Sequence, residues 1–292
     1  MQKRRFLKML AALTALVLFS GCLGAFAEAA DDWMNVLLLG CDSYTTNDRQ
    51  RTDSMIILSV NMQTNEVKLA SLMRDIWISV PGSSSHRKLT ELCAVGGPEL
   101  TVRAVNENLG MNIEKYMLVS MAGIAEIIDL VGGVEIDVTE AERKALNKGL
   151  FDLSSLSGME KLEASGEKVH LNGNQATAFA RIRKIDSDYV RVSRQRIVLL
   201  AMAEKFEANV TPVTLLSIIT TLLNYVETNM SLTDITICAN AGLQADLENI
   251  QQLRIPIDGS YESGTYSGTW SIRPNFSKNA QALHDFIYAG SN

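Results

Sequence analysis

Histidine and cysteine are scarce in this 292-residue chain, which contains three histidines and four cysteines. No two histidines have the spacing of zinc ligands, so zinc chemistry is not expected. Cys22 lies in an N-terminal apolar stretch, and the other three cysteines form no paired pattern. We therefore expect neither a disulfide framework nor a thiolate metal site, and interpret Cys41, Cys93 and Cys238 as small packing residues.

The chain also lacks a Pro/Gly/Ser-rich linker, a charge block and an internal repeat. Its 47% hydrophobic content suffices for a large core. We expect an N-terminal segment at residues 1–30 and one extracytoplasmic domain at residues 31–292. The net charge of −6 and the absence of a basic recognition helix argue against a nucleic-acid partner.

The N-terminal segment combines basic residues with an uncharged apolar run. Lys3, Arg4, Arg5 and Lys8 precede Met9–Ala27, and this order predicts that the N-terminus stays inside and the rest lies outside. The run approaches the ~20 residues that span a bilayer. We favour an uncleaved single anchor in the cell membrane, with lipidation at Cys22 or cleavage after Ala27 as alternatives. All three place the domain on the extracytoplasmic side of the cytoplasmic membrane.

Strands and helices are expected to alternate irregularly along the domain. Short apolar runs bounded by turn residues predict strands, and apolar residues at helical spacing predict helices. The expected strands are 35–40, 54–60, 67–72, 115–119, 134–138, 250–257 and 266–272. The expected helices are 98–108, 122–131, 173–180, 189–206, 211–228 and 278–288. This order favours an α/β fold with a central mixed, partly antiparallel sheet flanked by helices.

Positive charge is concentrated between Arg181 and Arg196, where five arginines and a lysine occur in an otherwise acidic chain. Like charges about 4 Å apart repel by about 4 kcal/mol at an effective dielectric near 20, so this crowding favours a bound polyanion over a solvated helix face. Arg181 and Arg183 leave the same face if their segment is extended. Asp188 can cap a helix that carries Arg191, Arg194 and Gln195 as one polar stripe.

A second charged cluster follows from the first three strands. If they pair antiparallel in sequence order, Asp42, Asp53 and Arg74 meet at one edge of the sheet. Two carboxylates without histidine suit a hard cation, Mg²⁺ or Mn²⁺, although aspartate is also common in turns. Asp75 is either a cap or a base that accepts a hydroxyl proton.

Several short motifs occur in the order seen in one family. They are G-C-D-S-Y, R-T-D-S-M, L-M-R-D, K-L-T-E-L-C-A-V-G-G, D-L-V-G-G-V, L-N-G-N-Q-A-T-A-F-A-R-I-R and D-S-D-Y-V-R-V-S-R-Q. On these motifs the chain resembles the LytR-CpsA-Psr (LCP) family of cell-wall phosphotransferases from about Asn35 to Arg196, with a looser match at Arg254–Pro256.

The resemblance implies transfer of a phosphoglycan from a polyprenyl pyrophosphate-linked donor to a peptidoglycan acceptor. By motif position, Asp42 and Asp53 would hold Mg²⁺. The pyrophosphate would be contacted by Arg74, Lys88, Arg181, Arg183, Arg191 and Gln195. Of these, Arg74, Arg181 and Arg183 would be catalytic, with Asp75 as the base. The resemblance also implies an apolar tunnel for the polyprenyl tail between sheet and helices.

This chain departs from the usual family residues at Tyr44, Met73, Ile76, Thr90 and Cys93, but it keeps the anion-binding motifs. Other functions use the same residues. The protein could bind the lipid-linked glycan without reacting, or hydrolyse it. A transcription regulator is a further alternative, which the exporting leader and the acidic charge oppose.

Overall fold

The computed structural model describes residues 32–41, 51–152, 160–182, 185–186, 188–209, 225–246 and 249–288. Its main element is a six-stranded sheet in the order β10-β3-β2-β1-β6-β9. These strands are β1 (Trp33–Cys41), β2 (Thr52–Asn61), β3 (Val67–Leu72), β6 (Lys115–Ser120), β9 (Val226–Thr228) and β10 (Gln251–Ile255).

The sheet is mixed, as the sequence predicts. β1 pairs antiparallel with β2 and β2 with β3, in sequence order. β6 lies parallel to β1, β10 lies parallel to β3, and β9 runs antiparallel to β6. The start of β2 and the end of β3 therefore lie at the same edge of the sheet.

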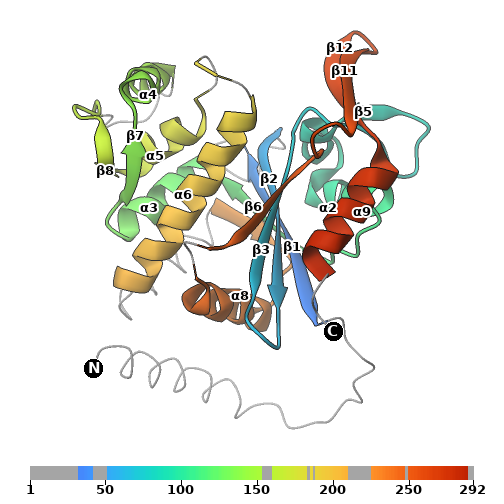
Figure 1. The fold of residues 1–292 in the computed structure, drawn as a ribbon, viewed down its shortest axis with the longest axis horizontal. Coiled ribbons are helices and arrows are strands. Elements are labelled where there is room, and N and C mark those ends of the chain that lie inside the picture. The colour runs from blue at the N-terminus through green and yellow to red at the C-terminus, as the bar shows by residue number, and fades with distance from the viewer. Residues whose placement is uncertain are drawn as a thin grey trace. The chain divides into compact units, whose positions relative to one another are not determined.

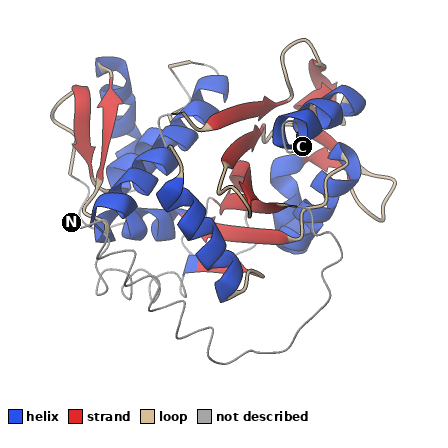
Figure 2. Cartoon of the chain, turned by 60° about the horizontal axis from the view of Figure 1, so that its bottom comes forward, coloured by secondary structure: helices blue, strands red, loops and turns tan. Residues whose placement is uncertain are grey.

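Helices cover the sheet in two groups, which Figures 1 and 2 show on either side of the strands. On one side, α2 (Leu89–Leu109) and α9 (Phe276–Tyr288) pack against the sheet. Leu37, Met55 and Leu283 belong to the core that they share. Gly110 ends α2 in the left-handed conformation with φ 63°, which glycine adopts without steric cost. On the other side, α8 (Leu232–Gln244) packs against β2 and β3 through Ala241.

A separate core lies beside the sheet. It joins the hairpin β7 (Val134–Val138) and β8 (Gly166–Leu171) to α3 (Met121–Leu130), α4 (Glu140–Asp152), α5 (Gly173–Ala180) and α6 (Asp188–Asn209). Gly173 allows the close approach of α5 to α3, because a Cβ there would lie 2.0 Å from the Ala125 carbonyl oxygen. This core fixes the position of α6, the helix that carries most of the arginine cluster.

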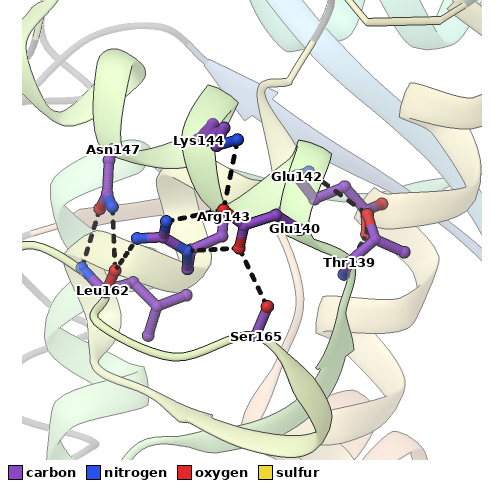
Figure 3. A network of polar contacts seen from close by, with 8 residues as sticks. All are labelled: Thr139, Glu140, Glu142, Arg143, Lys144, Asn147, Leu162 and Ser165. Carbon is purple, nitrogen blue, oxygen red and sulfur yellow. Dashed lines mark hydrogen bonds and ion pairs between the residues drawn. The ribbon is translucent and has the colours of Figure 1, made fainter.

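Polar contacts hold α4 in place, as Figure 3 shows. The Arg143 guanidinium donates to Glu140 at 2.8 Å and to the Leu162 carbonyl oxygen at 3.2 Å. The hydrogen bonds from Arg143 lower the pKa of Glu140 to about 2. At the start of α4, the Thr139 backbone and hydroxyl donate to Glu142. These contacts orient Glu142 toward α6.

Two small hairpins lie next to the end of β3. One is β4 (Trp77–Ser79) with β5 (His86–Lys88), and the other is β11 (Tyr261–Tyr266) with β12 (Thr269–Pro274). Ile272 N donates to the Asp75 carbonyl oxygen at 2.9 Å, and the Trp77 ring stacks on Tyr266 at 6.1 Å between centroids. The second hairpin therefore holds the Arg74–Asp75 backbone.

Two expectations about local structure are wrong. Val226–Thr228 is a strand paired with β6, not the end of a helix. Residues 266–272 include a hairpin turn with positive φ at Ser267 and Gly268, not one extended segment. The helix expected at 98–108 is present as the second part of α2, which starts at Pro98 after the non-helical residues Gly96 and Gly97, whereas the first part from Leu89 was not expected. Most of 211–228 lies outside the described residues.

The N-terminal apolar run Met9–Ala27 also lies outside the described residues. Among the helices that the structure describes, none is both long and apolar enough to cross a bilayer.

Candidate functional site

Asp53 and Arg74 meet at the edge where β2 begins and β3 ends. Arg74 Nη1 donates to Asp53 Oδ1 at 2.6 Å. The two side chains are 20% and 23% exposed, so the pair faces solvent over part of its surface. The predicted meeting of Asp53 and Arg74 is confirmed, whereas Asp42 lies outside the described residues.

Asp75 joins this pair to Lys88. Lys88 Nζ donates to Asp75 Oδ1 at 2.7 Å, and Arg74 Nε lies 3.4 Å from Asp75 Oδ2. The contact follows from the β4–β5 hairpin, which places Lys88 opposite Trp77, two residues after Asp75. The geometry fits a carboxylate that orients Arg74 and Lys88. Among the described residues, the Asp75 side chain forms no contact that caps a helix or a turn.

Two buried hydroxyl groups lie next to these charged residues in the chain. Thr52 directly precedes Asp53, and Thr90 N donates to the Arg74 carbonyl oxygen at 3.0 Å. Neither Thr52 Oγ1 nor Thr90 Oγ1 forms a hydrogen bond within the described ranges. Buried hydroxyls usually have a partner, so these two atoms suit a site that holds water or a polar ligand.

Helix α6 approaches the same edge from the arginine cluster. Gln195 Nε2 donates to the Asp53 carbonyl oxygen at 3.4 Å, across 142 residues of sequence. Arg191, one turn earlier, is 1% exposed. The two stretches of chain that the sequence assigned to one anion site therefore meet in the fold.

Arg194 has a structural role instead. It is 2% exposed, its Nε donates to Glu142 at 2.9 Å, and its Nη atoms bond Asp186. Burial lowers the pKa of Arg194, but the hydrogen bonds that Arg194 donates to Asp186 and Glu142 outweigh that effect and raise its pKa. Arg194 thus fixes α6 to α4 rather than contributing to the expected polar stripe.

Replacing Glu142 with glutamine should lower the free energy of unfolding by about 2 kcal/mol, because it leaves Arg194 with one carboxylate partner. Burial raises the pKa of Glu142, but the hydrogen bonds that Thr139 and Arg194 donate to it have the larger, opposite effect. The pKa of Glu142 is therefore lowered overall. Because the pKa of Glu142 is lower in the folded state, the ionised side chain stabilises the fold at pH values above its unfolded pKa of about 4.5. This stabilisation is lost as the pH falls from that value through the folded pKa.

Thermal unfolding measured between pH 3 and pH 7 checks this prediction, with the exposed Glu262→Gln as control. The difference between wild type and Glu142→Gln should shrink in acid. A difference that stays constant with pH would show that the Glu142 charge does not stabilise α6.

Arg181 does not lie in an extended segment, and that expectation is wrong. It is the C-cap of α5, with φ −99° and ψ −4°, because α5 continues to Ala180 and its last turn includes the next residue. Arg181 is half-buried. Arg183 lies outside the described residues, as does the side chain of Asp188.

Sequence reasoning did not assign Arg196 and Arg254 to the site. Both lie near it, since Arg196 follows Gln195 and Arg254 pairs in register with Ser71 near the end of β3. Only their positions in the sequence pointed to the site. Arg196 lies at the end of the arginine cluster, and Arg254 lies in the looser match at Arg254–Pro256.

The donor atoms available for a metal are carboxylate oxygens. Asp53 presents a partly exposed carboxylate, and the described residues contain no group of three His, Cys, Asp or Glu side chains that could hold an ion. Carboxylate oxygen is the ligand type that a hard cation prefers, and Asp42, the second carboxylate expected at this edge, lies outside the described residues.

The fold and the site define an α/β protein that gathers arginines, a lysine and carboxylates at one edge of a mixed sheet, a composition suited to phosphate groups. The LytR_cpsA_psr family model matches residues 19–282, and the chain belongs to this family.

Known proteins agree with this assignment. Regulatory protein MsrR of Staphylococcus aureus (strain COL) is 29% identical over 262 residues, which cover 88% of this chain and 75% of MsrR. Polyisoprenyl-teichoic acid–peptidoglycan teichoic acid transferase TagU of Bacillus mycoides (strain KBAB4) is 30% identical over 228 residues, 77% of this chain and 69% of TagU. The fold matches LytR-CPS2A-psr family protein YwtF (TagT) with bound octaprenyl pyrophosphate lipid, with a TM-score of 0.66, 20% identity and coverage of 90% and 93%.

Proposed function

We propose that this protein transfers a phosphoglycan, such as a teichoic acid, a capsular polymer or another secondary wall polymer, from a polyprenyl pyrophosphate carrier to peptidoglycan. The observation that carries the proposal is the contact of Gln195 with Asp53, which brings α6 to the Asp53–Arg74 pair. The similarity to TagU, named as a teichoic acid transferase, supports it.

The proposed ligand is the pyrophosphate of the donor. Arginine forks match phosphate oxygens two at a time, and lysine adds a point charge. The residues that would contact it are Arg74, Lys88, Arg181, Arg183, Arg191 and Gln195. Asp75 would keep Arg74 and Lys88 oriented, because it contacts both.

In the proposed reaction, an acceptor hydroxyl oxygen forms a bond to the phosphorus that carries the glycan. The bond from that phosphorus to the bridging oxygen breaks, and polyprenyl phosphate leaves. The leaving phosphate takes up the proton that the hydroxyl loses, directly or through Asp75. The transition state of phosphoryl transfer is loose, so positioning and charge neutralisation carry most of the rate. The arginines supply both by holding the phosphate oxygens in place.

Asp53, together with Asp42, would hold Mg²⁺ or Mn²⁺, which supplies additional neutralisation of phosphate charge when it is bound. Chelation by EDTA should therefore abolish transfer, and added Mg²⁺ or Mn²⁺ should restore it. Full turnover measured in excess EDTA would contradict a metal requirement.

The polyprenyl tail would lie between the sheet and the helices on the α6 side. Leu38 of β1 and Leu199 of α6 are half-buried apolar residues outside the packed cores, and they are candidates to contact the tail. The leader would anchor the chain in the cell membrane with the domain outside, next to both the lipid-linked donor and the wall.

Incubating the purified full-length protein with a lipid-linked donor and peptidoglycan fragments tests the proposal. Mass spectrometry should detect a fragment that carries the phosphoglycan. Free phosphoglycan alone would indicate hydrolysis, and an unchanged donor that remains bound to the protein would indicate a binding module. Either of these results would contradict transfer.

A further inference from the structure

One face of α6 carries residues that the proposed pyrophosphate site does not use. Tyr189, Ser193 and Arg196 are spaced by four and three residues, so they form a stripe along the helix. The stripe faces β10, because the Arg254 guanidinium lies 4.2 Å above the Tyr189 ring. Leu253 and Ile255, the neighbours of Arg254 in β10, pack in the core that the sheet shares with α2 and α9.

Arg254 is held firmly in this position. Its Nη1 donates to the Pro256 carbonyl oxygen at 2.7 Å, and its Nη2 donates to Asp258 Oδ1 at 2.5 Å. The Asp258 side chain is 88% exposed, so water screens much of that ion pair. The charge of Arg254 is therefore only partly offset.

The positive charge of Arg196 is offset less than that of Arg254. Its Nη2 donates to Ser193 Oγ at 3.3 Å, while its buried Nε forms no hydrogen bond within the described residues. No carboxylate in the described ranges forms an ion pair with it. Burial, followed by the nearby charge of Arg254, lowers the pKa of Arg196. A partly buried cation that faces a second cation is costly unless an anion binds with them.

This arginine pair lies next to the proposed pyrophosphate site without being part of it. β10 pairs with β3, whose end leads to Arg74, and neighbouring strands are about 4.8 Å apart. Arg196 directly follows Gln195, which contacts Asp53. A ligand that occupies the Asp53–Arg74 edge can therefore extend to the pair formed by Arg196 and Arg254.

We propose that Arg196 and Arg254 bind a second anionic group, a phosphate or a carboxylate, on the glycan part of the lipid-linked donor. Planar guanidinium groups recognise both oxyanions through paired hydrogen bonds. The pair makes the protein selective for acidic glycans over neutral ones. This inference rests on the proposed function, because it assigns a substrate class to the same site.

Three donors with the same lipid and pyrophosphate test the proposal, one with a neutral disaccharide, one with a carboxylate on the sugar and one with a phosphate. Dissociation constants and turnover are measured for the full-length wild type, Arg196→Gln and Arg254→Gln. Arg103→Gln is the control, since Arg103 is exposed on α2. Wild type should bind an acidic donor about 10–100-fold more tightly than the neutral one, and both variants should lose this preference. Binding of the neutral donor should change little, and the control should match wild type.

The two acidic donors identify the oxyanion. An equal affinity of wild type for all three donors would overturn the subsite, as would an unchanged preference in both variants. Turnover separates the two proposals. Selective binding without any product would contradict the proposed function and leave the subsite supported. Product formation without selectivity would support the proposed function and contradict the subsite.

Stability measurements exclude a purely structural role. Arg196→Gln removes a poorly compensated charge, so the ligand-free variant should unfold at a temperature a few degrees above that of wild type. Arg196→Lys keeps the charge and should keep part of the preference. Arg196 would instead serve the fold if Arg196→Gln unfolds at a lower temperature than wild type and if neither Arg196→Gln nor Arg196→Lys prefers the acidic donors.

Discussion

An Asp53→Asn variant should fold normally and lose at least about 10³-fold in phosphoglycan transfer. The carboxylate has two functions in this account. It orients Arg74 through the 2.6 Å bond between Arg74 Nη1 and Asp53 Oδ1, and it offers an oxygen to the metal. Asparagine retains the size of the side chain but has no charge to hold either partner.

The Asp53→Asn assay uses the lipid-linked donor and peptidoglycan fragments, with the unfolding temperature measured in parallel. Asp285→Asn, an exposed aspartate on α9, is the matched control and should transfer at the wild-type rate. Wild-type transfer by Asp53→Asn would remove this edge of the sheet from the site.

An Asp75→Asn variant should lose about 100-fold in turnover, because Arg74 and Lys88 would no longer be held by their common carboxylate. Lys88 Nζ lies 2.7 Å from Asp75 Oδ1 and Arg74 Nε lies 3.4 Å from Asp75 Oδ2. If Asp75 acts by positioning these cations, the shape of the pH–rate profile should be the same in the variant as in wild type.

The alternative is that Asp75 accepts the acceptor's hydroxyl proton. In that case the acidic limb of the profile should vanish in Asp75→Asn. The double variant with Lys88→Gln distinguishes further, since residues that act as one unit give losses that do not add. Additive losses together with a missing acidic limb would assign Asp75 as the base.

The sequence predicted the central strands and the Asp53–Arg74 contact because both depend on local order. Strands joined by short turns pair antiparallel, so the start of β2 must meet the end of β3. The apolar runs that define these strands are buried, and their boundaries followed from turn residues such as those around Asn61–Glu66.

The errors arose where distant residues decide the outcome. Arg194 fitted a ligand-binding stripe by spacing, but it pairs with Glu142, 52 residues away. Val226–Thr228 continued a helical pattern, yet its pairing with β6 makes it a strand. Propensity and periodicity carry no information about such partners, so tertiary contacts overrode them.

Arg196 and Arg254 were missed for a related reason. One belongs to a helix and the other to an edge strand more than fifty residues later, and only the fold brings Arg254 to the face of α6 that carries Arg196. By contrast, the meeting of Gln195 with Asp53 was expected, because one pyrophosphate was assigned to both stretches of chain.

A crystal structure of this protein with bound polyprenyl pyrophosphate would test the central claim most directly. We expect the phosphate oxygens to lie within hydrogen-bond distance of Arg74 on the sheet edge and of Arg191 or Gln195 on α6. A pyrophosphate bound elsewhere, with neither Arg74 nor α6 in contact with it, would contradict the account.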